Sequence, residues 1–322
     1  MKPLVFALRA PDLAPWRRGN TGIEGVWHFD SGRRGRHVLI SALIHGNELC
    51  GAWALKDMLE LGLRPQTGCL TLVFANLRAF DRFDPMRHDA SRFVDEDMNR
   101  QWRAEALAQP HSIERKRVAE LLPWVEAADW LLDLHSMHDP GPPLLLVGMQ
   151  PRNLDLARQL GQPAHVVRDA GHSDGVRMRD YGRFGLPDAQ ALDVRSLLIE
   201  CGFHGDPASA VVARDLCARF LHQSAALPCA HQPASMKAWW QPQAGEQWLL
   251  DVTGAVVARS AHFKFAQDWQ ALQCLPETGT VIGDNDGDPV CTPYDDCVLV
   301  MPSLRQVRPG VTVARLARRV RL

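Results

Sequence analysis

Three apolar runs of the sequence each stop at a residue that can bind a metal or a proton. They are "LISALI" before His45, "DWLLDL" before His135 and "RSLLI" before Glu200. Glu48 follows His45 by three residues, a spacing that returns to the same side of the chain in a first helical turn. Two imidazoles and one carboxylate form the three-ligand set of a catalytic zinc site, whose fourth position holds water. If these side chains meet, they form such a set, and Glu200 is the spare carboxylate.

Each of these residues also has an ordinary structural explanation. A glutamate such as Glu48 is favoured in a first helical turn by the helix dipole, and a His-x-x-Glu pair is common by chance. A histidine at a strand end is usually only hydrogen-bonded. Asp133, two residues before His135 on the same strand face, can orient that imidazole. Glu200 is harder to explain, because a carboxylate at the end of a central strand is costly unless it is paired or functional.

The elements that would position these residues alternate along the first two thirds of the chain. Apolar, β-rich runs occupy 37–44, 69–76, 129–135 and 194–200, with segments of helical spacing between them. Strands interleaved with helices predict an α/β fold with a mixed, mainly parallel sheet flanked by helices. Ligands bind outside the carboxyl ends of strands in such sheets, so the three polar strand ends are expected at one edge.

The character of the sequence changes near residue 235. Beyond it, short strands are separated by Gly, Pro and Asp turns, which is typical of a small β domain. A chain of 322 residues also favours two domains over one. We therefore predict a zinc-dependent catalytic α/β domain over 1–235 and a C-terminal all-β domain over 236–322.

Composition excludes some partners. The net charge of −1 provides no overall field to attract nucleic acid or an anionic membrane. No stretch is long and apolar enough for a membrane span, and the apolar start is shorter than a signal peptide needs. The 8 cysteines lack CxxC pairs and are interpreted as reduced thiols, so a cytoplasmic location is expected. The oligomeric state stays open, a homo-oligomer included.

Four motifs in order strengthen the metal interpretation: "HGNE" (45–48), "SRFVDEDMNR" (91–100), "DLHS" (133–136) and "IECG" (199–202). Together they resemble the succinylglutamate desuccinylase and aspartoacylase family, zinc amidohydrolases related to the zinc carboxypeptidases. The resemblance extends over roughly residues 35 to 205, and the β-rich tail fits the family's smaller C-terminal domain. It implies a zinc carboxypeptidase-like fold.

The resemblance also implies roles for single residues. His45, Glu48 and His135 are then the ligands of one Zn²⁺ ion per chain. Glu200 is the catalytic carboxylate, and Arg92 matches the arginine that helps to polarise the scissile carbonyl.

Asn99 and Arg100 match the family's Asp-x-Asn-Arg element, whose arginine binds a substrate carboxylate. Gln190 stands where some aspartoacylases have a further substrate arginine, and Tyr294 is only the nearest candidate for their C-terminal tyrosine. Aspartoacylase specificity is therefore not implied. The glycine-rich loop 169–187 matches neither group, and long loops often bind ligands, so we expect acyl or side-chain specificity there.

These inferences predict a zinc-dependent amidohydrolase acting on linear amides. The expected substrate is an N-acyl amino acid, of the N-acetyl or N-succinyl type, or a similar small amide bearing a carboxylate. A zinc-activated water would attack the amide, with Glu200 as general base. One alternative is a metallocarboxypeptidase that cleaves short peptides. A second is a non-catalytic, metal-binding regulatory protein that keeps the fold.

Overall fold

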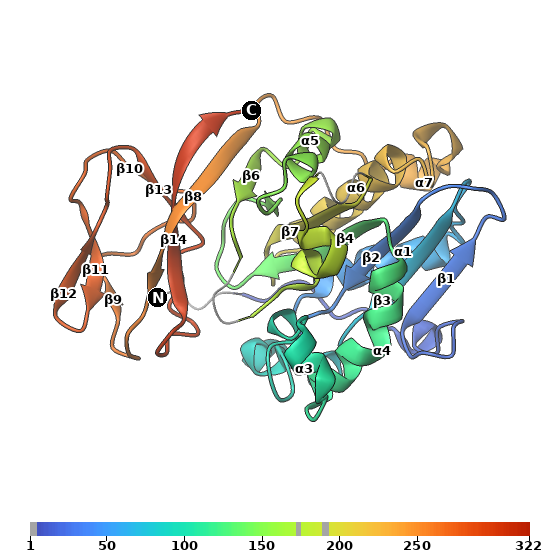
Figure 1. Ribbon diagram of the computed structural model, residues 1–322, viewed down its shortest axis with the longest axis horizontal. Coiled ribbons are helices and arrows are strands. Elements are labelled where there is room, and N and C mark those ends of the chain that lie inside the picture. Colours follow the sequence, from blue (N-terminus) through green and yellow to red (C-terminus); the bar gives the residue numbers. More distant parts are fainter. Residues whose placement is uncertain (1–4, 172–174, 189–192) are drawn as a thin grey trace.

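A twisted central sheet dominates the computed structural model, which describes residues 5–171, 175–188 and 193–322 (Figure 1). The strands of this sheet, from one edge to the other, are β1 (Val26–Asp30), β3 (Cys69–Phe74), β2 (His37–Ala42), β4 (Trp130–Met137), β7 (Arg195–Phe203), β5 (Leu144–Leu146), β6 (His165–Arg168), β8 (Trp248–Val257), β14 (Thr312–Arg321), β13 (Cys297–Val300) and β10 (Cys274–Leu275).

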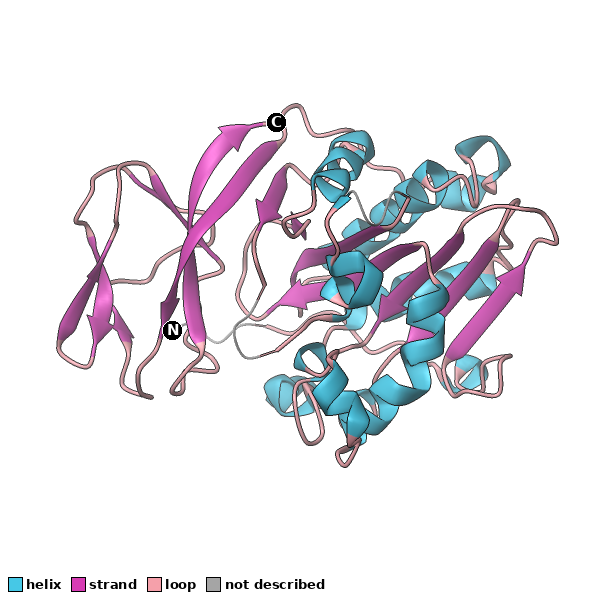
Figure 2. Cartoon of the chain, viewed as in Figure 1, coloured by secondary structure: helices cyan, strands magenta, loops and turns pink. Residues whose placement is uncertain are grey.

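The middle of the sheet is parallel. Strands β3, β2, β4 and β7 pair in parallel, whereas β1 is antiparallel to β3 and β5 is antiparallel to β7. Helices lie on both sides of this part of the sheet (Figure 2). The predicted mixed, mainly parallel α/β fold is therefore confirmed.

The described helices fall into α-helices and short 3-10 turns, and none of them is long and apolar enough to cross a membrane. The α-helices are α1 (Leu49–Glu60), α2 (Leu77–Phe80), α3 (Ala104–Ala108), α4 (Ile113–Ala127), α5 (Pro151–Leu160), α6 (Ala208–Gln223) and α7 (Ala234–Lys237). The 3-10 turns are η1 (Ala14–Trp16), η2 (Pro85–Ser91), η3 (Met98–Arg100), η4 (Met178–Asp180), η5 (Gly182–Gly185) and η7 (Cys229–His231).

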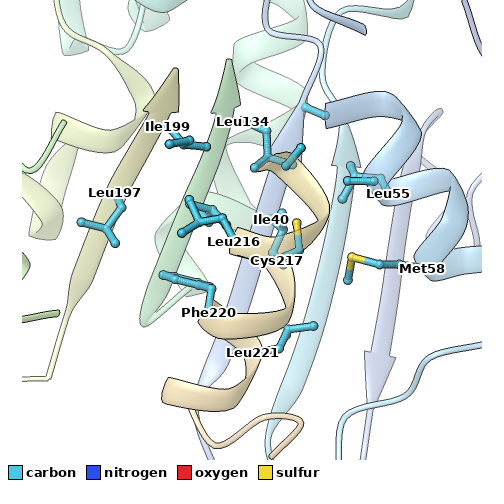
Figure 3. Packing of buried hydrophobic residues seen from close by; sticks show 14 of the residues in the cluster. Ile40, Leu55, Met58, Leu134, Leu197, Ile199, Leu216, Cys217, Phe220 and Leu221 are labelled. Carbon is cyan, nitrogen blue, oxygen red and sulfur yellow. The ribbon is translucent and has the colours of Figure 1, made fainter. Parts of the chain in front are cut away.

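Two apolar layers hold the central strands from opposite sides. On one face, Leu216 and Phe220 of α6 pack with Leu55 of α1 over Ile40 and Leu197 of the sheet (Figure 3). On the other face, α4 packs against alternate residues of the same strands. Because both faces are covered, every residue of β4 is buried.

The C-terminal β region extends the same sheet, first by one parallel pairing and then by antiparallel pairings. Strand β8 pairs in parallel with β6, and β14, β13 and β10 follow it. A smaller sheet stands beyond them, made of β9 (Lys264–Phe265), β11 (Val281–Asn285) and β12 (Asp288–Cys291). The boundary proposed between 235 and 236 falls within α7 and stays a prediction.

Candidate active site

His45 and Glu48 lie where the chain leaves β2 and enters α1. Gly46 between them packs so tightly that a Cβ atom there would lie 2.3 Å from the carbonyl carbon of Ala79. Glu48 occupies the N-cap position of α1, yet its side chain makes no capping hydrogen bond. Its Oε1 lies instead 2.7 Å from His45 Nδ1. A helix-opening role therefore does not account for the position of this carboxylate.

His135 completes a buried three-residue group with this pair. Its Nδ1 lies 2.7 Å from Glu48 Oε2, and one donor atom from each of His45, Glu48 and His135 falls within 4.8 Å of the others. Glu48 Oε2 nevertheless accepts no hydrogen bond among the described residues. The lone pairs of metal-ligand atoms this close repel one another unless positive charge lies beside them, either protons on the imidazoles or a cation. The group fits a divalent ion.

An aspartate lies behind each imidazole. Asp133 Oδ2 is 2.7 Å from His135 Nε2, and Asp97 Oδ1 is 3.0 Å from His45 Nε2. Each carboxylate favours a proton on Nε2 and leaves the Nδ1 lone pair directed toward Glu48, as a metal ligand needs. The predicted orienting role of Asp133 is supported by this contact. Sequence reasoning assigned no role to Asp97, although it is the first residue of the Asp-x-Asn-Arg element.

The electrostatics of the group favour a cation. Burial raises the pKa of Glu48, but the two histidines outweigh burial and hold that pKa well below its usual range. Burial lowers the pKa of His135, yet Asp133 and Glu48 outweigh it and raise the pKa well above the usual value. The lowered pKa favours the ionised form of Glu48, and the raised pKa indicates that the surroundings of His135 stabilise positive charge.

Glu200 lies on β7, directly opposite His135 on β4. Burial and the negative charge of Glu48 raise the pKa of Glu200 to about 8. Its Oε2 is buried and has no hydrogen-bond partner in the described part of the chain. The contacts of the described residues reveal no structural role for Oε2 of this carboxyl group. A buried carboxyl group with a raised pKa is a candidate for proton transfer.

Arg92 joins the same cluster from the end of η2. Its Nη2 donates to Asp97 Oδ2 at 3.1 Å, and its Nη1 donates to Glu48 Oε1 at 3.4 Å. The guanidinium is nearly buried, and its Nε has no hydrogen-bond partner within the described residues. Arg92 is therefore not a solvated surface arginine.

Asn99 and Arg100 follow on η3. Asn99 Nδ2 lies 3.4 Å from His135 Nε2, and its Oδ1 accepts a hydrogen bond of 2.8 Å from the Met178 amide. Arg100 Nη1 donates to the Asn99 carbonyl at 2.9 Å, and Arg100 borders the cavity described next. The structure thus gathers every residue of the predicted site around one place.

A cavity of about 850 Å³ opens in front of this cluster. His45, Glu48, Arg92, Arg100 and Glu200 line one side. The C-terminal β region also lines the cavity, mainly through residues 301–306 and 310–312, which run from the end of β13 to the start of β14, and through Phe265 and Trp269. Sequence reasoning did not identify this wall.

The other specificity candidates lie elsewhere. Loop 169–187 contributes no described residue to the cavity wall. One of its arginines, Arg177, instead pairs with Asp169 at 2.8 Å, and both residues are buried. The expectation that this loop lines the substrate site is therefore not met by its described residues. The Tyr294 hydroxyl oxygen lies 2.5 Å from Thr253 Oγ1 within the C-terminal β region, and Tyr294 does not line the cavity. Gln190 lies outside the described residues.

Comparison with known proteins found a family model that matches part of the chain and solved structures of similar fold. Residues 34–186 match the family model for the succinylglutamate desuccinylase/aspartoacylase catalytic domain, whereas comparison with curated protein sequences gave no match. A succinylglutamate desuccinylase from Chromobacterium violaceum is similar in structure, with a TM-score of 0.64 and 17% identity over 93% of this chain and 89% of that one. A succinylglutamate desuccinylase/aspartoacylase from Rhodobacter sphaeroides gives 0.61 and 18%, over 89% and 87%. Murine aminoacylase 3 gives 0.58 and 17%, over 90% and 97%.

Proposed function

We propose that the protein is a zinc-dependent deacylase, because residues 34–186 match the family model for the succinylglutamate desuccinylase/aspartoacylase catalytic domain. Its proposed substrate is an N-acyl amino acid of the N-acetyl or N-succinyl type, or a similar small amide that carries a carboxylate. The observation that carries this proposal is the buried convergence of His45, Glu48 and His135. Of these, His45 and Glu48 line one cavity together with Glu200.

His45, Glu48 and His135 would hold the ion. When bound, zinc supplies Lewis acidity, which lowers the pKa of water toward about 7 and polarises a carbonyl oxygen. Asp97 and Asp133 contribute by fixing each imidazole in the tautomer that presents Nδ1. Two imidazoles and a carboxylate also bind other divalent ions, so zinc itself is part of the proposal.

Glu200 would move the proton. As general base it would take a proton from the attacking water, and as general acid it would deliver that proton to the leaving amine nitrogen. Its pKa of about 8 supports the donating step, because burial and the charge of Glu48 stabilise the protonated form. A cation beside Glu48 offsets that charge and favours the ionised form, which the accepting step requires.

Two arginines would bind the charges of the reaction. Arg92 lines the cavity beside the proposed ligand Glu48 and can donate to the oxyanion that develops as water attacks. Arg100 borders the same cavity and offers a planar pair of donors that suits a carboxylate. Because Arg92 and Arg100 line the same cavity, their positions support a small substrate that carries both an amide and a carboxylate.

The test is metal analysis of the purified protein together with a panel of N-acetyl and N-succinyl amino acids. We expect one equivalent of a divalent ion and hydrolysis of at least one panel member. A metal-free protein that hydrolyses none of them would contradict the proposal. Cleavage of dipeptides with acyl amino acids untouched would indicate a metallocarboxypeptidase, and metal binding without any hydrolysis would indicate a regulatory protein.

A further inference from the structure

The segment 301–312 of the C-terminal β region is attached to the catalytic part of the chain just beyond His135. Ser303 Oγ donates to Asp139 Oδ2 at 2.6 Å, and Arg305 Nε donates to Asp139 Oδ1 at 2.8 Å. The next residue, Gln306, places its Nε2 3.2 Å from His138 Nε2. The cavity wall contributed by the C-terminal β region is therefore held by side chains that follow β4 directly.

His138 is the residue where this segment meets the catalytic cluster. Its Nε2 also lies 3.3 Å from Arg92 Nη1. A guanidinium nitrogen can only donate, so His138 Nε2 must be the acceptor and carries no proton. Gln306 then donates its amide to the same atom. The ring proton is left on Nδ1, which lies 3.1 Å from Asp89 Oδ1 and donates to it.

The surroundings keep this imidazole neutral. Burial lowers the pKa of His138 against the opposing effect of the hydrogen bond to Asp89, and Arg92 lowers it further. His204 approaches from the remaining side, with its Nε2 3.4 Å from His138 Nδ1, and burial also lowers the pKa of His204. A neutral acceptor holds Arg92 without adding a third carboxylate to Asp97 and Glu48, which would neutralise more of the charge that Arg92 presents to the reaction.

We propose that His138 is a positioning residue for Arg92, and that Gln306 holds His138 in place from the C-terminal β region. Without this acceptor, Nη1 of Arg92 is attracted only to Glu48, and the guanidinium turns toward the proposed metal ligands and away from the cavity. The two parts of the chain therefore share one catalytic site. The inference rests on the proposed function, since it concerns the arginine assigned to the oxyanion.

Steady-state kinetics of the full-length, metal-loaded protein test this arrangement, with the panel substrate that the unaltered protein hydrolyses fastest. His138→Leu removes the acceptor, and we expect kcat to fall about 10- to 100-fold with KM within about threefold, since an oxyanion donor acts mainly in the transition state. His138→Gln places an oxygen acceptor near the position of Nε2 and is expected to keep kcat within about threefold of the original. Gln306→Leu is expected to lower kcat by about three- to tenfold.

Matched controls separate this role from folding. His262→Leu and Gln267→Leu make the same changes at exposed positions of the C-terminal β region that do not line the cavity, and they should leave kcat unchanged. Metal content and the thermal midpoint are measured for each variant. The double variant His138→Leu/Gln306→Leu should lose no more activity than His138→Leu alone, because Gln306 acts through the same atom.

Two results would overturn the inference. One is equal loss of kcat in His138→Leu and His138→Gln; the other is a change in KM alone. If His138→Leu does not fold, Gln306→Leu decides the question. Failure of the unaltered protein to hydrolyse any panel amide would instead count against the proposed function.

Discussion

His135 and Glu200 lie directly opposite each other on the neighbouring parallel strands β4 and β7. Adjacent strands are about 4.8 Å apart, so this register places a proposed metal ligand and the spare carboxylate side by side. Glu48 approaches His135 from the start of α1 and raises the pKa of Glu200 through its negative charge. His135 therefore lies beside both Asp133, which orients its imidazole, and Glu200, the proposed proton carrier.

Glu200→Gln should separate metal binding from catalysis. The amide keeps the shape of the side chain but cannot accept the proton from water, so we expect kcat to fall about 10²- to 10⁴-fold while the metal content stays at one equivalent. The measurement is kcat with metal analysis on the same sample. Glu105→Gln, at an exposed position of α3, is the control. Retention of more than half of kcat would refute a role as general base.

Asp133→Asn should weaken metal binding without removing a ligand. Asp133 is fully buried and contacts His135 Nε2 at 2.7 Å, so the variant loses the charge that keeps Nδ1 basic and correctly turned. Loss of an orienting carboxylate typically lowers metal affinity about 10- to 100-fold. Competition with a chelating dye measures the affinity. Asp155→Asn, in an exposed ion pair of α5, should bind the ion as tightly as the original chain.

The sequence predicted the part of the site that depends on strand order. His45, His135 and Glu200 each end an apolar run, and parallel strands bring such ends to one edge, so the fold class and this edge follow from local pattern. Residue types alone did not decide between a metal site and chance; the order of four motifs did. The roles given to these residues stay predictions, although their positions are now known.

Contacts between distant segments could not be predicted in the same way. Asp97 contacts His45, which lies 52 residues earlier in the chain. Asp97 is also the N-cap residue of η3, where its side chain accepts a hydrogen bond from the Asn99 amide. Gln306 reaches His138 across 168 residues, between two parts of the chain with different architectures. Neither pair leaves a period or a spacing in the sequence. The contact between Gln306 and His138 depends on how the C-terminal β region packs against the rest of the chain, which only the assembled fold determines.

Arg100→Ala should affect substrates according to their carboxylate. If Arg100 binds that group in a charge-assisted pair, the variant should raise KM about 10- to 100-fold for the free acid, equivalent to roughly 1.5–3 kcal/mol. The same substrate with its carboxylate converted to an amide should bind weakly to both proteins and show little difference between them. Arg103→Ala, at an exposed position that does not line the cavity, is the control. Equal losses for acid and amide would show that Arg100 supports the fold instead.

Acid should destabilise the protein partly through Asp169. Both oxygens of this buried carboxylate accept hydrogen bonds from Arg177, at 2.8 and 3.2 Å, and Arg315 of β14 lies 3.6 Å away. Burial raises the pKa of Asp169, but Arg177 outweighs burial, so the pKa in the folded protein lies below the usual value. The stabilisation from this group is therefore fully present above the unfolded pKa of about 3.9 and is lost as pH falls below it.

Asp169→Asn tests this contribution by denaturant unfolding at pH 7 and near pH 3. At pH 7 the variant should lose about 3 kcal/mol, because the buried charge of Arg177 keeps only part of its compensation, from Asp180. Near pH 3 the difference from the original chain should shrink, because Asp169 in the unfolded original chain is then largely protonated, which stabilises the unfolded state, while the folded pair is still ionised. Asp155→Asn, in its exposed pair, should change stability by less than about 1 kcal/mol at either pH. A loss in Asp169→Asn that is the same at both pH values would mean that Asp169 stabilises the fold by packing and not by its charge.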